Sequence, residues 1–297
     1  MGTPEFAVAS LKALVESGEE VVCVVTATDK LGGRGGKQIL ESAVKKYAVS
    51  QGIPVLQPEK LKSKSFVTEL ASFKADIQIV VAFRMLPEVV WDMPALGTYN
   101  LHGSILPKYR GAAPINWAII NGEEKTGVTT FKLKHEIDTG NVFLQKEMDI
   151  LQDDTAGSVH DRMMDLGAKA IGETVSAIKN GIDQSYPQDD SLACTAPKIF
   201  HEDCKINFNQ PTSKVYDFIR GLSPFPGAYT YIDELETKII SCKPIFENDS
   251  ISSGNVLINP KSLHIHCTDG YIDVMELKME GKRQMNIKDF LNGYSRS

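Results

Sequence analysis

Short β-branched apolar runs alternate with segments of helical periodicity over the first 180 residues, and this alternation constrains the fold more than any other feature of the sequence. The apolar runs predict buried strands at Val21–Thr26, Ile77–Phe83, Thr98–His102 and Val128–Leu133. The amphipathic segments predict helices at Glu5–Glu16, Leu40–Gln51 and Val159–Asn180. Strands that alternate with helices predict an α/β fold with a mostly parallel sheet covered by helices on both faces.

The pattern changes near residue 181. The stretch Gly181–Lys198 has little periodicity and many turn-forming residues, which is typical of a linker. A helix is predicted at Ser213–Gly221, and short strands follow at Thr237–Lys243, Val256–Asn259, Leu263–His266 and Gly270–Leu277. Short strands at this spacing favour a small β-barrel of the oligonucleotide-binding kind. We therefore expect a first domain over residues 1–181, a linker over 182–200 and a barrel over 201–297.

Composition argues against several classes of protein. The 297 residues are 42% hydrophobic, and no run approaches the roughly 18 apolar residues of a membrane span. The five cysteines are scattered and never spaced as CxxC, so we expect reduced thiols and no metal site. A net charge of −6 argues against a general nucleic-acid-binding protein but leaves room for one local basic surface. We expect a cytoplasmic monomer that does not enter a membrane.

The stretch NLHGSILPKYRGAAPINW, from Asn100 to Trp117, places turn-forming and hydrogen-bonding residues directly after a predicted strand. Asn100 and His102 lie two residues apart, so their side chains project to the same face of that strand. The carboxyl edge of the sheet, where they would lie, is where open α/β folds bind ligands. An Asn can donate to a developing oxyanion, and a His can act as acid or base near neutral pH. The alternative is that Asn100 stabilises a turn and that His102 is a satisfied, half-buried histidine.

Asp138 favours the catalytic alternative. It lies in GVTTFKLKHEIDTG, residues 127–140, where a predicted strand enters a loop. A carboxylate beside an imidazole stabilises its charged form and fixes its orientation. Together the three side chains supply an oxyanion donor, a proton carrier and an orienting group, which suits attack of an amine on an acyl or formyl carbon. Alone, Asp138 would be a turn-capping residue, which is common.

A glycine-rich stretch with two basic residues follows the first predicted strand. Leu31–Lys37, LGGRGGK, fits neither a Walker A loop nor the dinucleotide fingerprint. Such a cationic loop could order on a phosphate backbone through Arg34 and Lys37, and the alternative is an exposed loop without a ligand. No Ser or Cys stands in an elbow motif, so direct transfer between two bound substrates is the simpler mechanism.

Four segments together closely resemble the methionyl-tRNA formyltransferases, within the 10-formyltetrahydrofolate-dependent formyltransferase family. They are MGTPEFAV (1–8), NLHGSILPKYRGAAPI (100–115), GVTTFKLKHEIDTG (127–140) and IRGLSPFPGA (219–228). The resemblance covers nearly the whole chain. It implies a Rossmann-like formyltransferase domain followed by a C-terminal barrel. It also implies transfer of a formyl group from 10-formyltetrahydrofolate to the α-amine of methionyl initiator tRNA, without a metal.

The resemblance also implies roles for individual residues. The implied catalytic residues are Asn100, His102 and Asp138. The implied folate-binding residues are Ser104, Ile105, Leu106 and Pro107, with Phe83, Arg84, Met85 and Leu86 lining the pterin pocket. The implied tRNA-binding residues are Arg34 and Lys37, against the acceptor stem, and Lys198 in the linker.

The sequence departs from the family pattern at two places. The family begins with a strand before MGTPEF, at the centre of the sheet, whereas this sequence starts at Met1 of that motif. If no segment fills the gap, we expect the neighbouring strands to lose backbone partners, at a cost in stability and activity. Secondly, Ile206-Asn207-Phe208 stands where the family often has a Trp, which we interpret as a packing substitution.

Other functions remain as alternatives. Glycinamide ribonucleotide transformylases normally lack an extra barrel, and RGLSPFPGA favours tRNA over an amino-sugar nucleotide as acceptor. A non-catalytic RNA- or folate-binding module would not need Asn100, His102 and Asp138 as a set. A nucleotide-dependent oxidoreductase would carry the glycine fingerprint, which this sequence lacks.

Overall fold

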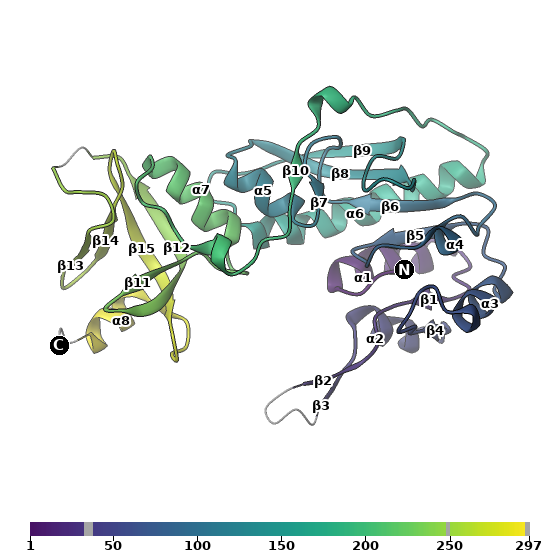
Figure 1. The fold of residues 1–297 in the computed structure, drawn as a ribbon, viewed down its shortest axis with the longest axis horizontal. Helices are drawn as coiled ribbons and strands as arrows, with labels where there is room; N and C mark the ends of the chain where they lie inside the picture. The colour runs from purple at the N-terminus through teal and green to yellow at the C-terminus, as the bar shows by residue number, and fades with distance from the viewer. Residues whose placement is uncertain (33–37, 248–249, 295–297) are drawn as a thin grey trace. The chain divides into compact units, whose positions relative to one another are not determined.

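The computed structural model describes residues 1–32, 38–247 and 250–294, and the chain divides into two compact units. The first unit comprises Met1–Gly111, Thr126–Met148 and His160–Thr195, and the second comprises Ala112–Lys125, Asp149–Val159 and Ala196–Ser297. The predicted α/β architecture with a C-terminal β domain is confirmed, and the β domain, predicted as a small barrel, is a curled antiparallel sheet that forms a half-barrel (Figure 1).

The sheets of the first unit contain both parallel and antiparallel pairs. Strands β5 (Gln78–Val81) and β6 (Thr98–His102) are parallel, and β1 (Val24–Val25) pairs in parallel with β4 (Val55–Leu56). Strand β8 (Lys125–Lys132) is antiparallel to β6 and neighbours β9 (Val142–Asp149). The sequence did not predict β9, because only its first two residues are buried and it therefore lacks an apolar run.

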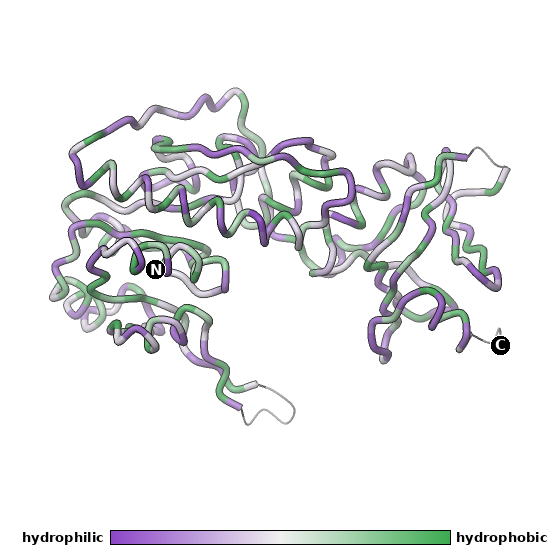
Figure 2. Tube along the Cα trace, turned by 180° about the vertical axis from the view of Figure 1, so that it is seen from behind, coloured by the Kyte–Doolittle hydropathy of each residue, from purple (hydrophilic) through white to green (hydrophobic). Residues whose placement is uncertain are grey.

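The helices follow the amphipathic segments of the sequence. Helix α1 spans Glu5–Glu16, as predicted, and α2 begins at Ala43, where the Ser42 hydroxyl caps it by accepting from the Lys45 backbone N–H. The long helix α6 (Ala156–Lys179) alternates hydrophilic and hydrophobic residues along its length (Figure 2). Helix α2 ends at Ser50. The remaining elements of this unit are α3 (Lys64–Ser72), α4 (Glu88–Trp91), β2 (Lys30–Gly32), β3 (Gln38–Leu40), β7 (Arg110–Gly111) and a 3-10 turn at Asp190–Leu192.

A cavity of about 550 Å³ lies where β1 and β5 face each other. Residues 21–25 and 75–79 line it, together with apolar side chains of α1 and α6. Met1 and Gly2 occupy one end: the Met1 ammonium donates to the Ile79 carbonyl (2.6 Å), and the Met1 carbonyl accepts from the Val81 N–H (2.9 Å). The Gly2 N–H donates in turn to the carbonyl of Val25 (3.0 Å). These three hydrogen bonds join residues 1–2 to β1 and β5 at that end of the cavity.

The second unit is built around a curled antiparallel sheet of strand order β11-β12-β15-β14-β13, with β16 on β15. Its core includes Ile206 and Phe208, as the packing interpretation requires. Within the described residues, no helix of the chain combines the length and apolar character needed to cross a membrane. The elements are α5 (Pro114–Ile120), β10 (Thr195–Ala196), a 3-10 turn at Glu202–Cys204, α7 (Thr212–Leu222), β11 (Tyr229–Ile232), β12 (Leu235–Ile245), β13 (Val256–Ile258), β14 (Leu263–His266), β15 (Tyr271–Met279), β16 (Met285–Asn286) and α8 (Ile287–Gly293).

Candidate active site

The carboxyl ends of β5 and β6 define the edge at which most predicted residues of the first unit gather. Because these strands are parallel and adjacent, the loop after Val81 and the loop after His102 leave the sheet on the same side. Asn100 and His102 both belong to β6 and project to one face, as the spacing predicted. Asn100 is partly exposed, whereas His102 is buried.

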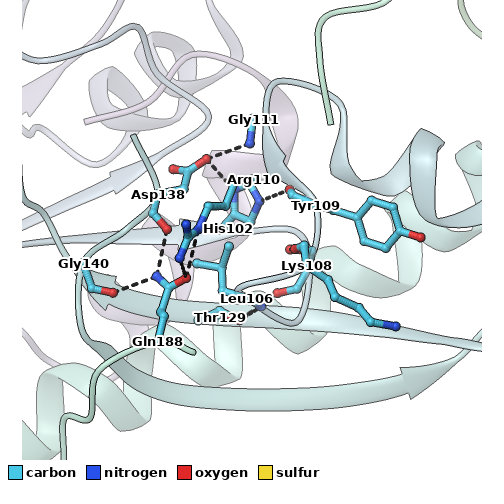
Figure 3. Close-up of polar contacts among 11 residues, drawn as sticks. His102, Leu106, Lys108, Tyr109, Arg110, Gly111, Thr129, Asp138, Gly140 and Gln188 are labelled. Carbon is cyan, nitrogen blue, oxygen red and sulfur yellow. Dashed lines mark hydrogen bonds and ion pairs between the residues drawn. The ribbon is translucent and has the colours of Figure 1, made fainter. Parts of the chain in front are cut away.

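The His102 ring has a polar neighbour at each of its two nitrogens. Nε2 lies 2.8 Å from the backbone carbonyl oxygen of Tyr109, and Nδ1 lies 3.7 Å from Oδ2 of Asp138 (Figure 3). A carbonyl oxygen only accepts, so we assign a proton to Nε2. Nδ1 is therefore the nitrogen that faces the carboxylate. The 3.7 Å separation is too long for a good hydrogen bond, and catalytic contacts of this kind commonly tighten when substrate binds.

Asp138 reaches this histidine from the loop between β8 and β9. Its backbone adopts a left-handed conformation (φ 56°), which Asp tolerates better than most residues with a side chain. Oδ2 accepts a hydrogen bond from the Gly111 N–H (2.9 Å), and only 11% of the side chain is exposed. The carboxylate thus binds a segment 27 residues away in sequence, which differs from the simple turn-capping alternative.

Hydrogen bonds from neighbouring strands hold the Ser104–Pro107 turn. The Thr129 hydroxyl donates to the Ser104 carbonyl (2.7 Å) and accepts from the Leu106 N–H (3.1 Å). The side-chain amide of Gln145 donates to the Leu106 carbonyl (2.7 Å). Ser104 and Leu106 are buried, so their side chains support the turn from within. The partly exposed members are Ile105 and Pro107.

The predicted pterin segment follows β5. Met85 is 70% exposed and Phe83 is partly buried, whereas Leu86 packs into the core below. The Arg84 guanidinium donates to the backbone carbonyls of Pro58 and Glu59 and lies 5.6 Å from the centre of the Phe83 ring. Arg84 therefore ties this segment to the loop after β4, and Phe83 and Met85 are its accessible apolar side chains.

Of the three predicted tRNA-binding residues, the structure describes only Lys198. Arg34 and Lys37 lie outside the described residues. Lys198 belongs to the second unit, where it is exposed and its ammonium lies 5.0 Å from the centre of the Phe200 ring. His135, a nearby rival to His102, pairs with Glu88 (3.0 Å) on the surface. In the part of the chain that the structure describes, no group of three metal-ligating side chains occurs.

Sequence reasoning did not single out several residues that hold the site together. Tyr109 and Arg110 lie inside the motif after β6, and Thr129 lies in the motif that contains Asp138, so the motifs themselves were the available signal. Gln188 had no such signal, because it lies in the aperiodic stretch predicted to be a linker. Its side chain contacts both sides of the site (Figure 3).

Gly140 offers a direct test of the Asp138 loop. A Cβ at this position would overlap the backbone carbonyl oxygen of Lys132 and crowd the Phe131 ring. We expect Gly140→Ala to displace the loop and lower kcat by about 10- to 100-fold, since small misplacements of catalytic groups cost this much. Gly172→Ala is the matched control, because nothing lies within 4 Å of that Cβ on α6. Steady-state kinetics of both variants test this prediction. Equal kcat values would mean that the position of the Asp138 loop does not affect the rate.

A profile of the formyl transferase family matches residues 1–175, and a profile described as formyl transferase, C-terminal domain, matches residues 198–295. The chain is 50% identical over 305 aligned residues to a protein of Parabacteroides distasonis named methionyl-tRNA formyltransferase, covering 99% of this chain and 94% of that protein. The protein of that name from Flavobacterium johnsoniae is 46% identical over 298 residues, with the same coverage.

Solved structures share the fold at lower identity. The sugar 3N-formyl transferase WlaRD, crystallised with dTDP and 5-N-formyl-THF, matches with a TM-score of 0.69 and 21% identity, over 95% of this chain and 97% of that one. HypX from Aquifex aeolicus, in complex with tetrahydrofolic acid, matches with a TM-score of 0.60 and 19% identity, over 83% of this chain and 43% of that one.

Proposed function

The chain belongs to the formyl transferase family, and from that premise we propose that it formylates methionyl initiator tRNA for translation initiation. The formyl donor in this proposal is 10-formyltetrahydrofolate, used as a substrate. The observation that carries the proposed chemistry is the placement of Asn100, His102 and Asp138 at one sheet edge. The near-full-length identity to relatives named methionyl-tRNA formyltransferase supports the acceptor.

The proposed reaction is a direct transfer. The neutral α-amine of the methionyl group attacks the formyl carbon and forms the new C–N bond. The carboxamide of Asn100, whose side chain is partly exposed, donates to the oxyanion that develops on the formyl oxygen. The bond between the formyl carbon and N10 of the folate then breaks, and the proton released by the amine moves to N10.

His102 and Asp138 act together in this proposal. A doubly protonated His102 ring places one N–H on the Tyr109 carbonyl and leaves the N–H on Nδ1 for the oxyanion. Asp138 lies beside Nδ1 and stabilises that charged form through its own negative charge. The Tyr109 carbonyl holds the His102 ring in place through Nε2. Nδ1 is therefore already oriented toward the position of the oxyanion before substrate binds.

The remaining assignments are parts of the same proposal. Residues 1–181 form the catalytic domain, 182–200 the linker and 201–297 the tRNA-binding domain. The folate lies against Phe83–Leu86 and Ser104–Pro107, where Met85, Ile105 and Pro107 offer accessible apolar surface. Arg34, Lys37 and Lys198 contact the tRNA. The protein works as a monomer in the cytoplasm, where aminoacylated tRNA is available.

An acceptor panel tests the substrate. Purified protein is incubated with 10-formyltetrahydrofolate and, in separate reactions, methionyl initiator tRNA, glycinamide ribonucleotide and an amino-sugar nucleotide. We expect formylated product on the tRNA alone, and its loss in His102→Ala. Product on the sugar nucleotide or on glycinamide ribonucleotide, with none on the tRNA, would replace the proposed acceptor. Full activity of His102→Ala would remove the proposed catalytic site.

A further inference from the structure

The tripeptide Tyr109–Gly111 contacts the catalytic pair from two sides. The Tyr109 carbonyl accepts from His102 Nε2, and the Gly111 N–H donates to the Asp138 carboxylate. The Arg110 side chain between them does not join either contact. Its Nε and Nη2 both donate to Oε1 of Gln188, at 3.1 and 2.7 Å (Figure 3). Nη2 also pairs with Asp190 (2.6 Å), whose side chain is 79% exposed.

The other end of the Gln188 amide holds the Asp138 loop. Nε2 donates to the backbone carbonyl of Asp138 (2.8 Å) and to that of Gly140 (2.8 Å). The amide therefore makes four hydrogen bonds and has one consistent orientation. Turning it over would place its oxygen against two carbonyl oxygens and its NH2 group against a guanidinium, which has no acceptor.

The backbone that carries Gln188 is itself fixed. Tyr186 exchanges two backbone hydrogen bonds with Val142 at the start of β9, each 2.9 Å long. Its phenol donates to Oε1 of Gln145 (2.9 Å), the residue that holds the Leu106 carbonyl. Pro187 follows and restricts the backbone between the two contacts. The backbone position of Gln188 is therefore fixed by the hydrogen bonds of Tyr186.

We propose that Gln188 is a positioning residue that sets the distance between the Asp138 carboxylate and the His102 ring. It links the tripeptide that holds His102 to the loop that carries Asp138, so the two halves of the pair share one rigid connection. This role rests on the proposed function, in which that pair stabilises the transition state. The hydrogen bonds of the Gln188 side chain go to the Arg110 guanidinium and to the backbone carbonyls of Asp138 and Gly140, so its role is to position the pair.

Two substitutions separate positioning from simple anchoring of the segment. Gln188→Glu keeps the length and the acceptor for Arg110, now with a charge, but it turns an oxygen toward the carbonyls of Asp138 and Gly140. Gln188→Met keeps the length and removes all four hydrogen bonds. We expect both to lower kcat about 10- to 100-fold with KM for each substrate within twofold. We expect the melting temperature of Gln188→Glu to stay near that of the wild type, since its pair with Arg110 persists.

The matched controls are Gln184→Glu and Gln184→Met, at an exposed glutamine of the same segment, and they should change nothing. If Gln188 only anchored the segment, Gln188→Glu would retain wild-type kcat, which would overturn the proposal. A second readout does not need turnover: 15N NMR of the imidazole side chains, with His102 assigned from His102→Ala. The His102 signals should move in both Gln188 variants and stay in both Gln184 variants. An inactive wild type would refute the proposed substrate, whereas unmoved His102 signals would refute the positioning role.

Discussion

Asp138→Asn is expected to lower kcat for formyl transfer by about 1,000-fold while the protein stays folded. The Asn carboxamide oxygen can still accept from the Gly111 N–H, so the loop keeps its attachment. What is lost is the negative charge 3.7 Å from His102 Nδ1. In the proposed mechanism, the His102 ring then has no negative charge beside it when the oxyanion forms. General acid–base and electrostatic contributions of this kind are typically 10²- to 10⁴-fold, which sets the size of the expected loss.

The control for this substitution is Asp165→Asn, which removes the same charge from an exposed position on α6. Rates should be measured as single turnovers with enzyme in excess, so that product release does not mask the chemical step. Circular dichroism and the melting temperature should match the wild type for both variants. A fall in kcat of less than about threefold in Asp138→Asn would mean that the carboxylate acts only through the Gly111 contact.

The placement of Asn100, His102 and Asp138 in the candidate site could be predicted because each of these residues lies in a short segment with its own sequence pattern. Asn100 and His102 share a strand whose period of two fixes their common face, whatever the rest of the fold does. The strand, the following turn and the Asp138 loop each carry their own pattern of apolar, glycine and polar residues. The structure then adds what the sequence could not: that Nε2 of His102 is occupied by the Tyr109 carbonyl, which leaves Nδ1 as the nitrogen facing Asp138.

The stretch predicted as a linker shows why the sequence did not predict the contacts of Tyr186 and Gln188. Tyr186 and Gln188 are held by hydrogen bonds to backbone and side chains, and neither contact needs a buried apolar stripe. Periodicity reports only burial that repeats along a strand or helix, so an irregular segment can be anchored without any periodic signal. The same reason explains β9, whose polar second half pairs with β8 while remaining largely accessible.

In a chain that begins at Met1, burial of the α-amine makes the free energy of unfolding depend on pH in a defined window. Burial lowers the pKa of the Met1 α-ammonium from 8.0 to about 6, against the opposing influence of the Cys23 thiol. Between pH 6 and 8 the unfolded chain therefore binds more protons, and the free energy of unfolding rises with pH. The free energy of unfolding has its full value above pH 8, decreases as the pH falls from 8 to 6, and levels off below pH 6. Two units of pKa correspond to about 2–3 kcal/mol.

Five apolar residues placed before Met1, such as Ile-Val-Val-Ile-Val, are expected to flatten this pH dependence and to stabilise the fold further. A peptide bond replaces the buried amine, and the added strand fills the cavity between the edges of β1 and β5. Burial of the β-branched side chains should add about 2 kcal/mol after the cost of ordering them.

A Gly-Ser extension of equal length is the control: it removes the amine but offers no apolar side chains. Urea unfolding at pH 6 and pH 8.5 compares the three proteins, since the six histidines are common to all. Equal pH slopes would show that the Met1 amine is not the cause, and equal stability of the two extended chains would show that the cavity does not accept a strand.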